Sequence, residues 1–294
     1  MANSNGWGDG AANNSIGWGQ GANNSIGWGD SHAKSWAGLT DIVGIDADAQ
    51  AFITAAAITE PVQINAINTL VEGMKTDGIW TKMKAVYPFV GGTATTHKWN
   101  LKDPRDLDAA FRLVFNGGWT HSSNGATPNG TNGYADTKLN ENTVMTLNDI
   151  HMSFYSRTNS TVASCDIGCL DTSTLYGTHI IPYSSGNAAI RNTDLSSGFT
   201  ATANTLGLFV NSRISSAQTK YFYNASLFNT IVSPSISKSN QVYFLGARNT
   251  GGSASSFSPK QLAFSSIGDG LTDTEAANLY TRVQAFQTSL SRQV

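Results

Sequence analysis

Short apolar runs separated by turn clusters dominate the chain from Tyr87 onward and constrain its fold most strongly. Runs of this length, bounded by Gly, Asn, Pro and Ser, are typical of β-strands. Seven or more short strands in about 200 residues predict an antiparallel β-sandwich. The predicted strands are His97–Leu101, Phe111–Phe115, His151–Arg157, Leu206–Arg213, Lys220–Phe228, Gln241–Ala247 and Gln261–Ile267.

The composition agrees with a mainly β chain that has many turns. Gly, Ser, Thr and Asn make up 118 of the 294 residues, and these residues suit turns and strand faces rather than long helices. Only 13% of residues are charged and the net charge is −2, so the chain has no basic surface for a polyanion. We therefore predict no nucleic-acid partner.

Three further features limit the class of protein. A transmembrane helix needs about 18 uninterrupted apolar residues. No segment of the sequence approaches this length, so we predict no membrane partner. The N-terminus has neither the basic nor the apolar region of a secretory signal. Cys165 and Cys169 are expected to be reduced thiols, with a local disulfide as the alternative, because a zinc site would need two more ligands.

A Gly-Trp-Gly repeat occupies the first 36 residues. Its copies begin at Gly6, Gly17 and Gly27, and the third decays towards Trp36. Such a short, glycine-rich unit cannot bury enough surface to fold alone, but each Trp can bury a large area on a partner. We predict a docking segment over residues 1–36, and the alternatives are a flexible linker or a sugar- or choline-binding array. The expected anchors are Trp7, Trp18, Trp28, Trp36, Ile16 and Ile26.

Two segments are predicted to be helical. Residues 37–86 form a helical connector or oligomerisation region, because apolar residues recur at helical spacing after Pro61. Residues 273–290 form an amphipathic helix, which Thr272 and Glu275 introduce with a capping-box pattern. The expected order is therefore docking segment 1–36, connector 37–86 and sandwich 87–294.

Several motifs of the sandwich region resemble a module common in virion proteins of tailed bacteriophages. The motifs are Tyr87–Gly92, Trp99–Pro104, Asn116–Thr120, Asn129–Ala135, His151–Arg157, Leu245–Asn249 and Ser266–Glu275. The resemblance covers roughly residues 85–294, and it implies a concanavalin A-like, laminin-G-like jelly-roll sandwich. It also implies a tail fibre, head fibre or decoration protein that is assembled in the host cytoplasm into the virion. A homo-oligomer, with a trimer as the guess, is implied by the resemblance alone.

The sequence lacks the patterns that hydrolytic sites need. It has four Glu, and no Glu-x-Asp-x-x-Glu strand pattern or Gly-x-Ser-x-Gly elbow. None of its five His forms a His-x-x-x-His pair. We predict no enzyme, no catalytic residue, no cofactor and no metal site. Laminin-G-like domains often hold calcium at a rim loop, so the resemblance leaves one alternative to the absence of a metal, a calcium site with Asp136, Asp149 and Asp166 as candidate ligands.

The leading hypothesis is a non-enzymatic structural component of a phage virion, anchored to other virion proteins by residues 1–36. The alternative is a carbohydrate-binding adhesin of the tail that recognises a host surface glycan, and a glycan hydrolase is a remote third. Aromatic side chains beside amides suit sugars through stacking and hydrogen bonding, although these residues could equally be turn residues. The candidate glycan-binding residues are Trp119, His121, Asn124, Asn129, Asn132 and Tyr134.

Overall fold

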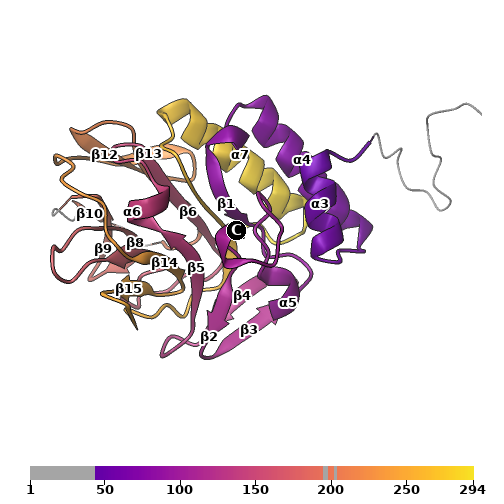
Figure 1. The fold of residues 1–294 in the computed structure, drawn as a ribbon, viewed down its shortest axis with the longest axis horizontal. Helices are drawn as coiled ribbons and strands as arrows, with labels where there is room; N and C mark the ends of the chain where they lie inside the picture. The colour runs from indigo at the N-terminus through magenta and orange to yellow at the C-terminus, as the bar shows by residue number, and fades with distance from the viewer. Residues whose placement is uncertain (1–43, 195–197, 202–203) are drawn as a thin grey trace, which may run out of the picture. The chain divides into compact units, whose positions relative to one another are not determined.

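The computed structural model describes residues 44–194, 198–201 and 204–294. The predicted docking segment lies outside the described residues, and so do its anchors Trp7, Trp18, Trp28, Trp36, Ile16 and Ile26. Residues Asp46–Val294 form one compact unit, drawn in colour in Figure 1.

Two sheets pack face to face, as the sequence predicted. The first has the spatial order β13-β12-β11-β6-β17-β4-β3, and β1 also pairs with β17. All pairs in this sheet are antiparallel. Its strands are β1 (Met83–Tyr87), β3 (Trp119–Ser122), β4 (Gly125–Pro128), β6 (Ile150–Ser156), β11 (Gly207–Arg213), β12 (Gln218–Tyr223), β13 (Ser226–Val232) and β17 (Leu262–Gly268).

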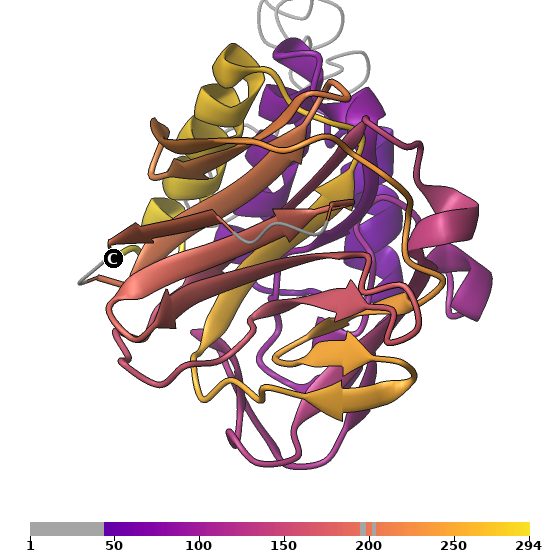
Figure 2. The ribbon, with the colours of Figure 1, turned by 90° about the vertical axis from the view of Figure 1, so that its left-hand side faces the viewer.

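The second sheet has the order β10-β9-β8-β7-β14-β5-β2, with β15 beside β7 and β16 beside β15. It crosses the front of the molecule in Figure 2. Its pairs are antiparallel except that β15 runs parallel to β7. Its strands are β2 (Val114–Asn116), β5 (Tyr134–Asn140), β7 (Ile167–Leu170), β8 (Gly177–Ser184), β9 (Asn187–Asn192), β10 (Gly198–Ala201), β14 (Val242–Leu245), β15 (Arg248–Thr250) and β16 (Ser253–Ser255).

The helices gather mainly on the outer side of the first sheet (Figure 1). α7 contacts α4, and Arg282 on α7 pairs with Asp77 at the end of α4 at 2.7 Å. The helices are α3 (Ala47–Ala55), α4 (Pro61–Thr76), α5 (Ala94–His97), α6 (Glu141–Val144) and α7 (Asp273–Ser289), with 3₁₀ turns η1 (Trp80–Lys82) and η2 (Asp108–Ala110). The predicted C-terminal helix and its capping box are confirmed: Thr272 Oγ1 accepts from the Glu275 N–H, and the Glu275 carboxylate accepts from the Thr272 N–H.

The core lies between the two sheets. Strand β5 alternates buried and half-buried residues, the pattern of a strand with one face on the core. Strands β6, β11 and β17 are buried along their whole length, because a second layer covers their outer side. Gln284 on α7 accepts a hydrogen bond from Tyr155 of β6, and Gln287 donates to the Ala263 carbonyl of β17. All three strands, which are covered on both sides, were among those predicted from the sequence.

The end of the expected connector lies inside the sandwich. Met83–Tyr87 is strand β1, which pairs with β17 from Tyr87↔Ser265 to Met83↔Gly268. The helical prediction holds for α3 and α4, with Pro61 in the first turn of α4. The apolar residues Ile79, Trp80 and Met83 are buried, so helical spacing alone could not separate a packed turn and strand from a continued helix.

Two strand predictions are wrong in position. The segment His97–Leu101 contains no strand, because Thr93 and Thr96 form a capping box that starts the one-turn helix α5. The segment Lys220–Phe228 is a hairpin rather than one strand. Asn224 and Ala225 both have positive φ, 45° and 68°, which is the type I′ geometry that reverses the chain between β12 and β13.

Candidate functional site

Two loops meet at one end of the sandwich, where the chain crosses between the sheets. We call residues 116–119 and 128–134 the tip. They join the end of β2 to the start of β3 and the end of β4 to the start of β5, at the lower end of Figure 1. The Asn129 N–H donates to the Gly118 carbonyl at 3.0 Å, so the two loops are one structural unit.

Asn129 and Asn132 organise the tip through their side-chain oxygens. Asn129 Oδ1 accepts from the backbone N–H groups of Thr131, Asn132 and Gly133, each at 3.0 Å. Asn132 Oδ1 accepts from Asn129 Nδ2 at 2.8 Å and from the Gly118 N–H at 3.0 Å. Both residues are exposed. Among the hydrogen bonds of the described residues none uses Asn132 Nδ2, so the two N–H donors of this exposed residue remain for a ligand.

Two candidate aromatic residues lie beside these amides but contribute mainly to packing. Trp119 is half-buried, and its indole N–H donates to the carbonyls of Asn116 at 3.1 Å and Tyr134 at 3.3 Å. Its ring meets Phe115 edge to face, with centroids 5.1 Å apart. Tyr134 is also half-buried and packs on Phe244 with centroids 4.5 Å apart. Each ring therefore offers a ligand part of its surface while holding the tip to the core.

His121 faces inward and pairs with a second histidine that sequence reasoning did not single out. His121 Nδ1 lies 2.9 Å from Nδ1 of His97, the last residue of α5. Burial lowers the pKa of His97 to about 3 and lowers that of His121 as well. Both rings are therefore neutral near pH 7. This pair anchors α5 to β3.

Asn124 lies at the other end of the hairpin from the tip. It occupies the turn between β3 and β4, about 10 Å along the strand from Trp119. The structure thus brings together Trp119, Asn129, Asn132 and Tyr134 and separates Asn124 from them. A two-residue turn after a four-residue strand is the signal that would have placed Asn124 correctly.

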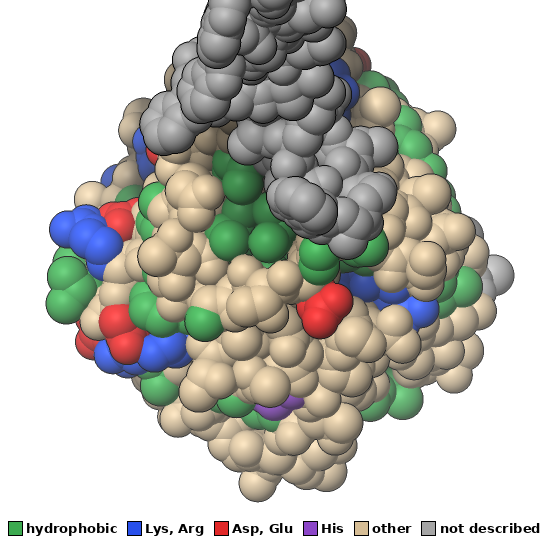
Figure 3. Space-filling model, turned by 90° about the vertical axis from the view of Figure 1, so that its right-hand side faces the viewer, with side chains coloured by type: hydrophobic (Ala, Val, Ile, Leu, Met, Phe, Trp, Pro, Cys, Tyr) green, Lys and Arg blue, Asp and Glu red, His purple; other side chains and the backbone are tan. Residues whose placement is uncertain are grey.

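The tip carries no formal charge. Between Arg112 and Asp136 the chain runs for 23 residues without Asp, Glu, Lys or Arg. Figure 3 shows the lowest part of one face as largely uncharged polar atoms, with charged groups higher up. The flanking Arg112 pairs with Asp108 at 2.8 Å, and Asp136 pairs with Lys138 at 3.0 Å. The tip is therefore a neutral surface of amides and backbone groups.

The acidic side chains inside the sandwich are engaged in structural contacts. Asp166 and Lys260 are fully buried, with Oδ2 and Nζ 3.2 Å apart. Asp194 and Arg213 form a second fully buried pair at 2.6 Å. Glu141 accepts hydrogen bonds from Cys169 at 3.0 Å and Thr178 at 2.6 Å, and burial raises its pKa. These groups hold the interior together and face no open cleft.

The candidate calcium ligands do not converge. Asp136 pairs with Lys138, Asp166 with Lys260, and Asp149 accepts from the Gly270 N–H at 2.6 Å. Within the described residues there is no group of three or more His, Cys, Asp or Glu that could hold a metal. Cys165 and Cys169 are free, buried thiols. In the part of the chain that the structure describes, no helix is long and apolar enough to span a membrane.

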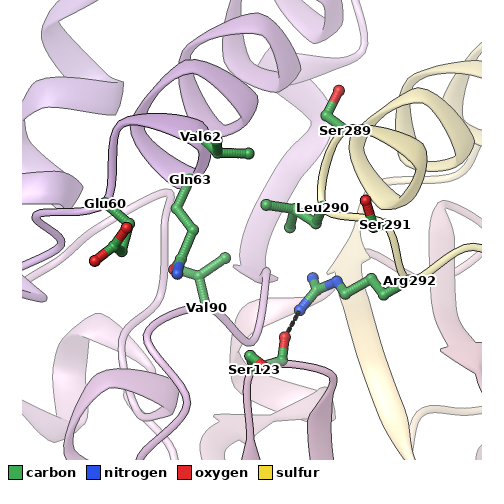
Figure 4. A pocket seen from close by; sticks show the side chains of 9 residues that line it. All are labelled: Glu60, Val62, Gln63, Val90, Ser123, Ser289, Leu290, Ser291 and Arg292. Carbon is green, nitrogen blue, oxygen red and sulfur yellow. Dashed lines mark hydrogen bonds between the residues drawn. The ribbon is translucent and has the colours of Figure 1, made fainter.

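A groove of about 180 Å³ opens between the start of α4 and the end of α7 (Figure 4). Val62, Val90 and Leu290 supply apolar walls, and Glu60 contributes the one carboxylate of its lining. Arg292 lies at its base, buried to 1% exposure, and makes five hydrogen bonds. Its guanidinium donates to the carbonyls of Pro88, Phe89, Ser123 and Ala263 and to Gln287 Oε1. Since every N–H of Arg292 is used within the chain, the groove is a structural junction. Sequence reasoning missed Arg292, because a lone Arg after a helix carries no signal of burial.

No model of a known protein family matches this chain, and no curated protein matches its sequence. Solved structures with a similar fold include domain 4 of AbnA, an extracellular arabinanase from Geobacillus stearothermophilus, in complex with arabinotriose. That similarity has a TM-score of 0.42 and 15% identity over 67% of this chain and 98% of that chain.

Two further similarities concern binding domains. The CBM40 of a Ruminococcus gnavus sialidase bound to α2,3-sialyllactose gives a TM-score of 0.36 and 16% identity, over 45% of this chain and 81% of that chain. The binding domain of botulinum neurotoxin serotype D gives 0.48 and 8%, over 70% of this chain and 52% of that chain. At these identities the likeness is one of fold. Carbohydrate-binding and receptor-binding β-sandwiches are thus among the structures that this chain resembles.

Proposed function

We propose that this chain is a non-enzymatic virion component of a tailed phage and that its sandwich binds glycan at the tip. The observation that carries the binding part is the Asn129–Asn132 network. Five hydrogen bonds fix the two exposed amides, so little conformational entropy remains to be lost when a ligand binds. The Asn132 amide and the half-buried side chain of Trp119 belong to the same pair of loops. Amide donors beside an aromatic surface match the hydroxyls and apolar C–H face of a sugar.

The non-enzymatic part rests on where the carboxylates are. Glycoside hydrolysis uses two carboxyl groups about 5–9.5 Å apart on either side of the scissile bond. The 23 residues around the tip contain none, and the buried Glu141, Asp166 and Asp194 each have a partner inside the sandwich. A sugar held at the tip would therefore be bound and not cleaved.

The virion part rests on the sequence motifs, in which Tyr87 and Asn100 make structural contacts. Tyr87 donates its hydroxyl to the Phe111 carbonyl at 2.6 Å. Asn100 Oδ1 accepts from the Val86 N–H at 2.8 Å, and its amide donates to the Ala110 carbonyl at 3.0 Å. These contacts join β1 to the loop before β2. The docking role of residues 1–36 and the homo-oligomer belong to the same proposal.

A glycan array tests the binding part. The full-length chain is labelled and applied to an array of bacterial and plant glycans, and retention above background on a related set of structures is the expected result. A chain that retains no glycan would contradict the proposed binding function. A reducing-sugar assay on every retained glycan tests the non-enzymatic part, for which release of product at a steady rate would be the contrary result.

Immunogold labelling tests the virion part. Antibody to residues 87–294 is expected to label intact particles, on the tail for an adhesin or on the head for a head fibre or decoration protein. Particles without label, from cells that contain the protein, would show that it is not a virion component. Deletion of residues 1–36 is expected to leave a folded chain that no longer joins particles.

A further inference from the structure

We infer that the tip selects neutral glycans and discriminates against glycans that carry carboxylate or sulfate groups. This inference rests on the proposed glycan-binding function and names the substrate class of the same site. Its basis is the charge distribution around the tip, taken over every segment that packs there.

The tip loops themselves contribute no cation. The nearest basic residue before them, Arg112, lies 3.3 Å from Asp106 and 2.8 Å from Asp108. The nearest basic residue after them, Lys138, is held by Asp136 at 3.0 Å. Each is half-buried and already paired, so neither is available to a charged ligand.

Among the described residues, the segments that pack against the tip contribute two basic residues, Lys260 and Arg248, and each is engaged in a contact of its own. Gly246, at the end of β14, lies against Trp119, and Pro259 lies against Gly130. The residue after Pro259 is Lys260, which is fully buried between Asp166 and Ser164. Arg248 follows Gly246 by two residues, and its Nε donates to Thr250 Oγ1 within the β15 segment at 3.2 Å.

The histidines beside the tip supply no charge near neutral pH either, because burial lowers the pKa of both His97 and His121. An acidic sugar placed on this surface would give up part of the hydration of its anion without gaining a cationic partner that offsets this loss. A neutral sugar exchanges water for amide and carbonyl partners at little cost. Because the tip supplies no cation, it is expected to bind neutral glycans more tightly than acidic ones.

The experiment compares neutral glycans with their acidic counterparts on the full-length chain. After the array screen, the strongest neutral glycan and its C6-oxidised uronic acid form are titrated by calorimetry at 50 and 500 mM NaCl. We expect the acidic form to bind about tenfold or more weakly. The dissociation constant of the neutral form is expected to change by less than about twofold with salt, since no ion pair is involved.

A charge-insertion variant tests the same point from the protein side. Thr131 is exposed, and only its backbone N–H is used in the Asn129 network, so T131K adds a cation without breaking that network. It is expected to strengthen binding of the acidic form about threefold or more. The matched control T69K, on the exposed side of α4, is expected to change neither affinity.

The possible outcomes distinguish a failure of this inference from a failure of the proposed glycan-binding function. Retention of neutral glycans with weak or absent binding of acidic ones supports the inference. Equal or tighter binding of the acidic form, or strong salt dependence of the neutral form, overturns the inference and leaves glycan binding intact. An array with no retained glycan overturns the proposed binding function itself.

Discussion

Arg292 joins four parts of the chain through one guanidinium group. It reaches the Pro88–Phe89 loop, the turn at Ser123, strand β17 at Ala263, and Gln287 on α7. Burial without a carboxylate partner lowers its pKa to about 9, so it stays charged at neutral pH and is balanced by carbonyl dipoles. Its neighbours explain why a single polar residue near the C-terminus is buried.

Replacement of Arg292 by Met is expected to lower the free energy of unfolding by about 3 kcal/mol or more, because several buried carbonyls lose their donor. Urea denaturation followed by tryptophan fluorescence measures this loss. The matched control R105A removes an exposed side chain that pairs only with the neighbouring Asp103, and its unfolding midpoint is expected to match that of the wild type. A wild-type midpoint in R292M would contradict the role assigned to Arg292.

Buried histidines predict acid sensitivity. Burial lowers the pKa of His151 to about 4, and its Nδ1 lies 2.6 Å from the Asp269 carbonyl. In the unfolded chain His titrates near 6.5, so between pH 6.5 and 4 the unfolded state takes up a proton that the folded state excludes. The free energy of unfolding should therefore decrease as pH falls through this window, by up to about 1.4 kcal/mol per pH unit for this residue.

Urea unfolding at pH 7, 6, 5 and 4.5 measures that slope. His97 and His179, whose pKa values burial also lowers, add to it in the same direction. The variant H151Q is expected to be less stable at pH 7 and to show a slope smaller by up to one proton. A wild-type stability that stays constant from pH 7 to 4.5 would be inconsistent with neutral, buried histidines.

At the scale of elements, the turn between β12 and β13 contains Ala225, a residue whose Cβ atom disfavours the backbone conformation that the turn requires. Ala225 has a φ of 68°, a conformation that costs a residue with a Cβ atom about 1 kcal/mol. Asn224, the other turn residue, tolerates positive φ and also accepts from the Leu208 N–H at 2.8 Å. The substitution A225G creates the Asn-Gly pair that type I′ turns favour.

A225G is expected to raise the free energy of unfolding by about 0.5–1 kcal/mol, the strain relief being partly offset by the larger entropy of the unfolded glycine. Thermal and urea unfolding measure the change. The control A217G places glycine at an exposed position without positive φ and should be neutral or destabilising. Equal effects of the two substitutions would argue against a strained turn.

The elements that could be predicted from sequence are those with one dominant signal. β6, β11 and β17 lie between two layers, are buried along their whole length and each contain at least three large apolar residues, and α7 has a capping box and an apolar stripe. β8 and β9 were missed because their residues mix polar, small and apolar types without clear alternation. β1 was missed because its pairing with β17 joins residues about 180 positions apart, and no local pattern reports such a contact.

The candidate site could be predicted in part, because its turns have local sequence signals. Asn-Gly and Gly-Gly clusters predict turns, and the turns at the tip do come together. The position of Asn124 in the hairpin depends on the length of β3. The burial of Trp119 depends on Phe115 and on Gly246, which come from the other sheet. The absence of charged residues from the tip could be predicted from the sequence. Whether charged residues from other segments lie beside the tip could be learned only from the structure.

At the scale of the whole molecule, the helical region and the sandwich are one folding unit. β1 completes the first sheet, and α4 packs on α7. A chain beginning at Tyr87 would lose α3, α4 and most of β1, leaving buried residues of β17 and α7 exposed to solvent. We expect residues 46–294 to unfold cooperatively and residues 87–294 to be insoluble or lack a transition, as judged by circular dichroism during heating. A cooperative transition for residues 87–294 would contradict a single unit.

We propose that the amide network of the tip binds glycan, and one pair of alanine variants tests this proposal. N132A removes the Oδ1 acceptor and the Nδ2 group of an exposed residue. N124A removes an exposed amide in the same Asn-Gly context at the far end of the hairpin. Calorimetric titration of the strongest array glycan into full-length wild type, N132A and N124A is the measurement. We predict that N132A weakens binding about tenfold or more while N124A binds like the wild type. Equal affinity of N132A and wild type, with both variants folded, would contradict it.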